Sequence, residues 1–141
     1  MFAIGLNNPK NGINVGHVLR AADAYGASMV AITGNRIRGG TDTSGAKFRI
    51  PVLMGDDLHK LIPFNCVPVA VDLVDGAEDL RSFQHPANAF YVFGAEDNTL
   101  GRAVLSWCKH TVYVPTRICM NLSACVNVVL YDRIAKLGLG K

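Results

Sequence analysis

Several patterns that would place this chain in a common class of protein are missing from its sequence. Half of its 141 residues are apolar, yet no stretch approaches the roughly 20 consecutive apolar residues that a membrane-spanning helix needs. The opening residues, MFAIGLNNPK, lack the basic start and sustained apolar segment of a signal peptide. We therefore expect a cytoplasmic protein without a membrane partner.

The sequence also lacks the cysteine and histidine spacings that bind zinc. Its four cysteines, Cys66, Cys108, Cys119 and Cys125, include no C-x-x-C pair. We expect reduced thiols, with a structural disulfide as the alternative, and no metal site. The four histidines are scattered along the chain, and each, His17 included, is interpreted as a surface or packing residue.

The common nucleotide-binding and hydrolase motifs are absent as well. Gly12 and Gly16, after the first apolar run, do not form a G-x-G-x-x-G turn, and no acidic residue ends the second apolar run. The sequence has no G-K-[ST] phosphate loop, no G-x-S-x-G elbow and no H-E-x-x-H helix. These absences argue against ordinary dinucleotide, nucleoside triphosphate and metalloprotease chemistry.

Short apolar runs alternate with helical stretches along the whole chain. The predicted strands are Phe2–Leu6, Met29–Thr33, Val67–Val71, Phe90–Phe93 and Val112–Val114. The predicted helices are Val15–Tyr25, Asp56–Leu61, Gly76–Phe83, Arg102–Cys108 and Asn121–Leu137. Strands that are apolar throughout are typical of a parallel sheet covered on both faces. The pattern predicts one α/β domain over residues 1–141, with a mostly parallel sheet flanked by helices and no linker to a second domain.

The last predicted helix lacks a polar face over most of its length. Residues 122–131 read LSACVNVVLY, and the sequence becomes amphipathic only after Asp132. A helix that is apolar all round is usually buried all round, whereas a terminal helix of a domain this small should meet water on one side. We therefore predict a homodimer packed through this helix, with burial under the chain's own loops as the alternative.

The net charge of +3 is small, but a basic, glycine-rich segment follows the second predicted strand. This segment contains Arg36, Arg38, Lys47 and Arg49 and a single acid, Asp42. Such a segment is either a solvated loop or a contact for a phosphate backbone.

Three polar clusters follow predicted strands, where ligands bind in open α/β sheets. They read NNPKNGINVGHVLR (7–20), FYVFGAEDNTLG (90–101) and VPTRICMNLSACVN (114–127). Each has a plain structural explanation, because Gly94 suits a turn, Glu96 suits a solvated surface and Asn121 suits a helix N-cap. Their order and spacing together favour a functional site.

These clusters resemble the three motifs of the SpoU/TrmH branch of the SPOUT methyltransferases, which methylate RNA ribose. The matching positions are Asn11, Asn14, Gly16, Arg20, Ala22 and Tyr25–Gly26 in the first motif, Gly94, Glu96 and Leu100 in the second, and Val114–Pro115, Met120–Ser123 and Leu130–Asp132 in the third. The chain departs from the family pattern at Ile13, Thr99 and Cys119, which replace two glycines and a serine.

The resemblance implies a fold, a cofactor and a site. The fold would have a trefoil knot in its C-terminal half and form an obligate dimer, and S-adenosylmethionine would be the methyl donor. The implied catalytic residues are Arg20, Asn14, Glu96 and Asn121. The implied cofactor-binding residues are Val71, Asp72, Phe93, Gly94, Ala95, Glu96, Val114, Pro115, Cys119, Met120 and Asn121. The residues expected to bind RNA are Asn11, Arg20, Arg36, Arg38, Lys47 and Arg49.

The resemblance leaves two questions open. Arg20 would either take the proton of a ribose 2′-hydroxyl or bind a phosphate and stabilise the forming alkoxide, and the second role suits a guanidinium better. The substrate would be tRNA rather than rRNA, by analogy with other single-domain members. The alternative function, motivated by Ile13, Thr99 and Cys119, is a non-catalytic dimer that binds RNA or the cofactor.

Overall fold

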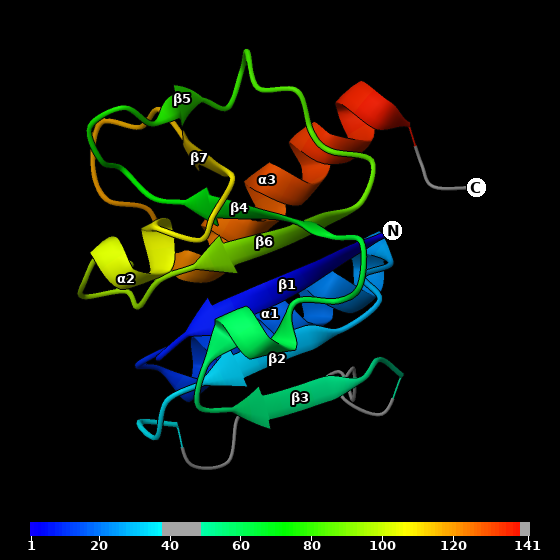
Figure 1. Ribbon diagram of the computed structural model, residues 1–141, viewed down its shortest axis with the longest axis vertical. Coiled ribbons are helices and arrows are strands. Elements are labelled where there is room, and N and C mark those ends of the chain that lie inside the picture. Colours follow the sequence, from blue (N-terminus) through cyan, green and yellow to red (C-terminus); the bar gives the residue numbers. More distant parts are fainter. Residues whose placement is uncertain (38–48, 139–141) are drawn as a thin grey trace.

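The computed structural model describes residues 1–37 and 49–138. Within these residues one sheet has its strands in the order β3-β2-β1-β6-β4-β7-β5, and every pair of neighbouring strands is parallel (Figure 1). The strands are β1 (Phe2–Asn7), β2 (Val30–Thr33), β3 (Val52–Gly55), β4 (Val67–Val71), β5 (Glu78–Asp79), β6 (Ala89–Phe93) and β7 (His110–Tyr113). The helices are α1 (Gly12–Tyr25), α2 (Arg102–Leu105), α3 (Leu122–Leu137) and the 3₁₀ helix η2 (Leu58–Leu61).

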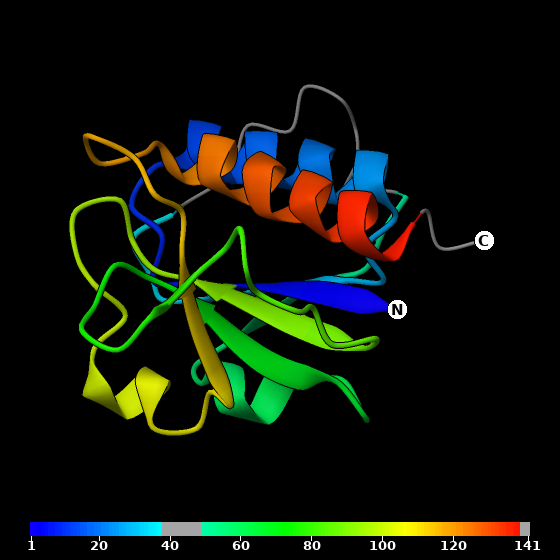
Figure 2. The same cartoon turned by 90° about the horizontal axis from the view of Figure 1, so that it is seen from above.

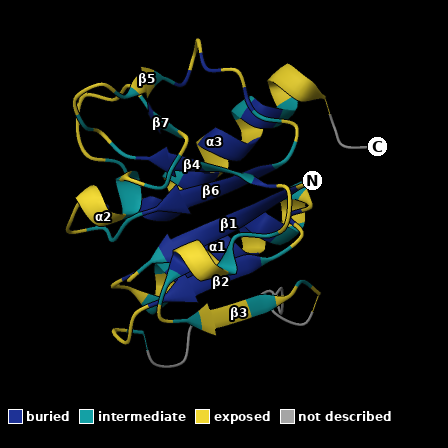
Figure 3. Cartoon of the chain, in the orientation of Figure 1, coloured by how far each residue is buried: buried dark blue, intermediate teal, exposed yellow. Residues whose placement is uncertain are grey.

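Helices cover both faces of the sheet. Figure 2 shows α1 and α3 side by side on one face, with η2 and α2 on the other. Val18 of α1 and Val129 of α3 are fully buried in the core of the first face, and Leu58 of η2 packs in the core of the second. Strands β2 and β6 are buried along their whole length (Figure 3). The prediction of a parallel sheet flanked by helices is confirmed.

The predicted helix Gly76–Phe83 is wrong. Gly76 has a φ of 83°, and the next residues form β5, which pairs with β7. The carboxylate of Asp79 then accepts a hydrogen bond from the backbone N–H of Arg81 at 2.8 Å, which turns the chain out of the strand. A side chain that bonds to the backbone two residues on competes with helix formation.

Three other elements differ in extent or type from their predictions. The helix predicted over Arg102–Cys108 ends at Leu105, and the one predicted over Asp56–Leu61 is the 3₁₀ helix η2. Strand β3 was not predicted at all. It is an edge strand next to β2, and Leu53 and Met54 on it are exposed although its sequence is apolar.

The strand order brings the loops that hold the three polar clusters to one edge of the sheet. β7 lies between β4 and β5, and the carboxyl ends of β1, β6, β4 and β7 all meet at one edge of the sheet because the strands are parallel. The segments that follow these strands hold the three polar clusters. None of the helices in the described part of the chain is long and apolar enough to cross a membrane.

Candidate active site

A hydrogen-bonded chain of three side chains joins the polar clusters at this edge. The amide nitrogen Nδ2 of Asn14 donates to Oε1 of Glu96 at 2.9 Å. The amide nitrogen Nδ2 of Asn121 donates to Oδ1 of Asn14 at 3.0 Å. Asn14 comes from α1, Glu96 from the loop after β6 and Asn121 from the start of α3, so one contact set ties together residues 82 and 107 positions apart.

The helix ends hold this network in place. Oδ1 of Asn121 accepts hydrogen bonds from the backbone N–H groups of Ser123 at 2.9 Å and Ala124 at 3.3 Å, so Asn121 caps α3. Its amide nitrogen is then free to reach Asn14. Asn11 caps α1 in the same way, through the N–H groups of Ile13 and Asn14. The capping explanation for Asn121 is therefore correct, and the same residue also joins two motifs.

Hydrogen bonds stabilise the charged form of Glu96. Its partial burial works to raise its pKa, but the bond from Asn14 and the backbone N–H groups of Glu96, Lys10 and Asn11 outweigh this effect, and the pKa lies below its ordinary value. The backbone N–H of Lys10 donates to Oε2 of Glu96 at 3.0 Å. Glu96 is thus an anionic acceptor that fixes the loop after β1 against the loop after β6.

Arg20 lies on the outward face of α1, where it is exposed. It borders a hollow of about 370 Å³ between α1 and α3, whose other lining residues are His17, Ala21, Ala24, Ser123, Ala124 and Asn127. Among residues 1–37 and 49–138, no hydrogen-bond or ion-pair partner holds its guanidinium. Within the part of the chain that the structure describes, Arg20 therefore does not cross-link the fold.

The loops that follow β4 and β7 border a second hollow at the same edge. This hollow of about 390 Å³ is lined by Leu73 and by residues 113–117. Its volume is in the range of small-molecule sites, which are mostly apolar with a few polar groups. Asp72, at the end of β4, accepts a hydrogen bond from the backbone N–H of Leu100 at 3.0 Å and so holds the loop after β6 beside it.

Gly94 offers a test of whether this edge accommodates a ligand. A Cβ at Gly94 would meet Leu100 at 3.4 Å, at the border of ordinary van der Waals contact, and the residue has no positive φ. Neither the backbone conformation nor the packing of this chain requires glycine there. A glycine at that position leaves the backbone after β6 without a side chain. Groups of three or more side chains able to hold a metal ion are absent from the described residues.

The basic residues expected to bind RNA are in different situations. Arg36 makes a two-point contact with Asp97, at 3.2 and 3.1 Å, and also donates to the backbone carbonyl of Asn8. Arg49 pairs with Asp23 of α1 at 2.7 Å. The guanidinium of Arg36 thus cross-links two loops, and that of Arg49 links its segment to α1. Arg38 and Lys47 lie outside the described residues.

The positions that depart from the family pattern are accommodated without strain. Ile13 lies in the first turn of α1 and is 56% exposed. Thr99 is exposed, and neither residue has a positive φ. Cys119 is an exposed free thiol in the loop before α3. None of the three belongs to the Asn14–Glu96–Asn121 network.

The sequence interpretation missed two residues of this region. His17 lines the hollow beside Arg20, although all histidines were set aside as surface or packing residues. Its spacing of three residues from both Asn14 and Arg20 was the available signal, since residues three apart on a helix share a face. Asp97, which holds Arg36, gave no such signal because its partner is distant in sequence.

The chain matches known proteins along nearly its whole length. The model of the SpoU rRNA methylase family matches residues 1–131. A relative from Archaeoglobus fulgidus, described as an uncharacterized tRNA/rRNA methyltransferase, is 30% identical over 142 residues, which cover 92% of this chain and 62% of the relative. The chain thus spans less than two thirds of that relative's length.

Two solved structures share the fold at low sequence identity. The SpoU methyltransferase AviRb from Streptomyces viridochromogenes, in complex with AdoMet, is 20% identical with a TM-score of 0.82 over 96% of this chain and 60% of that one. A structure concerned with the 2-OH methylation of C/U34 on tRNA is also 20% identical with a TM-score of 0.82, over 97% of this chain and 96% of that chain. Because the family model covers all three polar clusters, the chain belongs to the SpoU rRNA methylase family.

Proposed function

We propose that this chain methylates a ribose 2′-hydroxyl of RNA with S-adenosylmethionine as the methyl donor, and that its substrate is a tRNA. The observation that carries the proposal is the Asn14–Glu96–Asn121 network, which joins the three motifs; Arg20, on the same helix as Asn14, has no hydrogen-bond or ion-pair partner within residues 1–37 and 49–138. The tRNA assignment is supported by the neighbour concerned with tRNA methylation, because this chain covers 96% of it.

The residues divide between a donor side and an acceptor side. Leu73, Val114, Pro115 and the backbone of residues 113–117 would hold the adenosine part of the donor in the second hollow, with Gly94 allowing close approach. Phe93, Ala95, Cys119 and Met120 would complete this wall. The bound donor supplies an electrophilic methyl group on a sulfonium, and placing that methyl group in line with the acceptor oxygen accounts for much of the rate.

Arg20 belongs to the acceptor side. Its guanidinium has two parallel N–H donors that match a phosphate, and its positive charge stabilises oxygen as negative charge develops on it. The side chain is exposed and borders the hollow between α1 and α3, so a phosphate and the neighbouring ribose can reach it. Asn14 and Asn121 orient the start of both helices around this point.

The proposal includes a knot and a dimer. Val71 at the end of β4 and Glu78 at the start of β5 both align with Val112 of β7, so residues 72–77 arch past the end of β7, where the chain continues towards α3. This arrangement supports a threaded C-terminal segment.

The exposed apolar side chains of Val128 and Tyr131 on α3 support a homodimer packed through that helix.

The proposal is tested by replacing Arg20. We expect Arg20→Ala to lower methyl transfer to tRNA at least about 100-fold, the usual loss when one stabilising donor is removed. Binding of S-adenosylmethionine, measured by calorimetry, should stay unchanged, because Arg20 lies outside the donor hollow. Arg102→Ala is the matched control, since Arg102 is exposed on α2 at the opposite face of the sheet, and it should keep full activity.

Two results would contradict the proposal. If the wild-type chain binds S-adenosylmethionine but transfers labelled methyl to no tRNA or rRNA, it is a non-catalytic binding protein. If Arg20→Ala keeps wild-type turnover, the acceptor site lies elsewhere. Nucleoside mass spectrometry of the labelled RNA distinguishes methylation of ribose from methylation of a base.

A further inference from the structure

An ion pair crosses the end of β1 at the edge of the sheet that holds the polar clusters. β1 lies between β2 and β6 (Figure 1). Arg36, in the loop after β2, and Asp97, in the loop after β6, therefore come from the strands on either side of it. The guanidinium of Arg36 donates to both carboxylate oxygens of Asp97, at 3.2 and 3.1 Å. The pair thus spans the loop that follows β1.

The loop after β1 is held in the middle of this span. Nη2 of Arg36 also donates to the backbone carbonyl of Asn8 at 3.0 Å, and Nζ of Lys10 lies 3.7 Å from Oδ2 of Asp97. Asn8 has a φ of 52°, in the left-handed region that residues other than glycine rarely adopt. A Cβ at Gly34, after β2, would lie 2.8 Å from Cα of Asn8. The two loops are closely packed, and Arg36 holds the one with the rarer backbone conformation.

The conformation of this loop sets the position of the Asn14–Glu96–Asn121 network. The backbone N–H of Lys10 donates to Oε2 of Glu96 at 3.0 Å, and the other carboxylate oxygen of Glu96 accepts from Asn14 at 2.9 Å. Asn11 follows directly in the chain and caps α1, the helix that carries Asn14. A change in the loop would therefore move the contact with Glu96 and the start of α1 together.

We propose that Arg36 and Asp97 are positioning residues for the Asn14–Glu96–Asn121 network, an inference that rests on the proposed function. Their two-point contact fixes the loop after β1 in the conformation that bonds to Glu96, and so aligns the two sides of the site. The sequence alone assigned Arg36 to RNA. In the structure its donors face a carboxylate and a carbonyl group of the protein itself.

The geometry of the pair favours positioning over a contribution to stability. The side chains of Arg36 and Asp97 are 33% and 40% exposed, and exposed ion pairs add little to the stability of a fold. A planar guanidinium that bonds to both oxygens of a carboxylate, however, fixes direction as well as distance. The hydrogen bonds from Arg36 also hold the pKa of Asp97 below its ordinary value, so the carboxylate stays charged at neutral pH.

Two variants separate this role from a contact with RNA. Arg36→Lys keeps the positive charge but cannot make the two-point contact, and Asp97→Asn removes the carboxylate and leaves Arg36 charged. We expect each variant to lower kcat for tRNA methylation about 10-fold and to keep the KM for tRNA within about twofold, since a displacement of about 1 Å can cost up to about 100-fold in rate. The double variant should lose no more than either single variant, because both break the same contact.

The opposite pattern would overturn the inference. If Arg36 binds an RNA phosphate, Arg36→Lys keeps a kcat near wild type. Asp97→Asn, which releases the guanidinium, then lowers the KM for tRNA and makes it depend more steeply on salt. Arg102→Lys is the matched control, because Arg102 is exposed on α2 at the opposite face of the sheet (Figure 2), and it should behave as wild type. Both test variants should unfold in urea close to wild type, as expected for an exposed ion pair.

Amide hydrogen exchange gives a readout without turnover. The N–H of Lys10, which donates to Glu96, should exchange about 10-fold faster in both variants, because local opening of the loop exposes it. The N–H of Ser28, which donates to the carbonyl oxygen of Phe2 at 2.8 Å near the start of β1, should keep its rate. Unchanged exchange at Lys10 overturns the inference and leaves the proposed function standing. If the wild type transfers no methyl group to RNA, the proposed function fails, and the exchange rates still decide whether the ion pair fixes the loop.

Discussion

At the scale of single residues, a buried polar cluster behind the site has a defined protonation state. Arg133 donates to the hydroxyl oxygen of Tyr91 at 3.1 Å, so the hydroxyl hydrogen is left to point at Nδ1 of His85, 2.6 Å away. Nε2 of His85 lies 2.8 Å from Oδ2 of Asp132. Burial lowers the pKa of His85 and so favours its neutral form in the folded chain.

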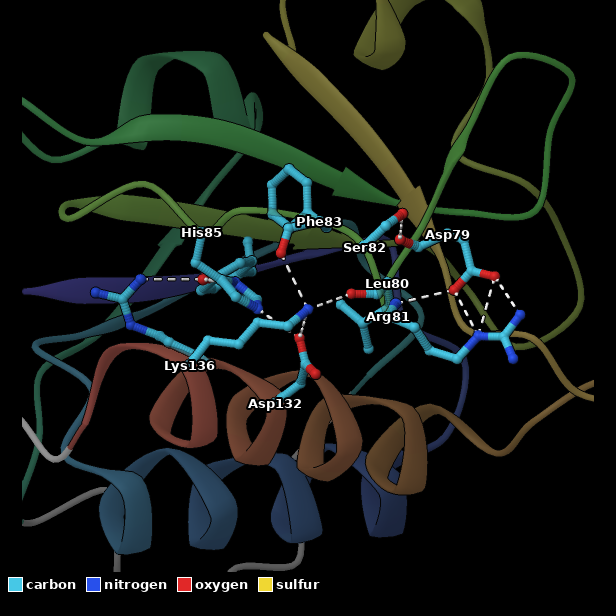
Figure 4. Close-up of polar contacts among 10 residues, drawn as sticks. Asp79, Leu80, Arg81, Ser82, Phe83, His85, Asp132 and Lys136 are labelled. Atoms are coloured by element: carbon cyan, nitrogen blue, oxygen red, sulfur yellow. Dashed lines mark hydrogen bonds and ion pairs between the residues drawn. The ribbon is translucent and has the colours of Figure 1, made fainter.

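This cluster clamps the segment before β6 onto α3. Lys136 pairs with Asp132 at 2.8 Å and donates to the carbonyl oxygen of Phe83 at 3.0 Å (Figure 4). Arg133 donates to the carbonyl oxygens of Pro86 and Ala87, each at 2.7 Å. No buried side-chain polar atom in the described residues is left without a partner, so protonation of any member must break a bond.

The neutral state of His85 predicts a loss of stability in mild acid. Burial lowers the pKa of His85, and the bond to Asp132 offsets only part of this effect. In the unfolded chain the pKa returns to about 6.5, so below that pH the unfolded state binds a proton that the folded state does not. The contribution of His85 to the free energy of unfolding, measured with urea, should be complete above pH 6.5 and fall as the pH drops towards the lower, folded pKa.

His85→Gln identifies the residue responsible for this slope. The variant should be less stable at pH 7.5, because the cluster is disturbed, but its stability should change little between pH 7.5 and 5.5. His59→Gln should keep the wild-type slope. An equal decline in both variants would assign the acid sensitivity to other groups.

Much of the site was predictable residue by residue because its members lie at fixed spacings in three motifs. Asn14, Glu96 and Asn121 were expected together, and the structure joins them directly. The ion pair of Arg36 with Asp97 was not predictable, since it links two loops 61 positions apart. Contacts of that kind depend on how strands are ordered, which no local pattern encodes.

At the scale of elements, two glycines have opposite explanations. A Cβ at Gly5 in β1 would lie 2.6 Å from Cζ of Phe90, a buried core side chain. A Cβ at Gly94, after β6, would meet only Leu100 at 3.4 Å. The fold requires the first glycine, whereas neither the backbone conformation nor the packing requires the second.

We expect these glycines to separate stability from binding. Gly5→Ala should lower the free energy of unfolding by about 1–3 kcal/mol, the usual cost of overpacking a core. Gly94→Ala should unfold close to wild type but bind S-adenosylmethionine more weakly in calorimetry. The explanation of Gly94 fails if its variant keeps wild-type affinity for the donor.

The elements themselves were predictable where burial left a continuous signal. β1, β2, β4, β6 and β7 are apolar runs in the sequence, and α1 and α3 are long enough to show their character. β3 was missed although Val52, Leu53 and Met54 also form an apolar run in the sequence. The segment containing β5 was taken for a helix because two residues are too few to show a strand period, while its neighbours at 76–83 have helix-like composition.

At the scale of the whole molecule, the outward side of α3 exposes apolar side chains that the fold of a single chain does not bury. Val128 is 37% exposed and Tyr131 63% exposed. Both line an apolar hollow of about 530 Å³. Val114 and Pro115, in the loop after β7, line the same hollow. A second copy of the chain packed on Val128 and Tyr131 would cover the outward side of α3, whose sequence is apolar all round.

We expect light scattering to give twice the mass of one chain for the wild type. Tyr131→Asp and Val128→Asp together should give the mass of one chain, because two buried charges would oppose association. Phe64→Asp is the matched control, since Phe64 is 97% exposed in the loop between η2 and β4, and it should leave the mass unchanged. A wild-type mass of one chain at micromolar concentration would refute the dimer.

The place of β7 between β4 and β5 also affects how the chain folds. β5 precedes β7 in sequence, so the slot between β4 and β5 must stay open until residues 110–113 enter it. Strand pairing between distant segments slows folding, and unpaired strand edges in the intermediate promote aggregation. The insertion of β7 between β4 and β5 therefore implies slow refolding, with a yield that falls as protein concentration rises.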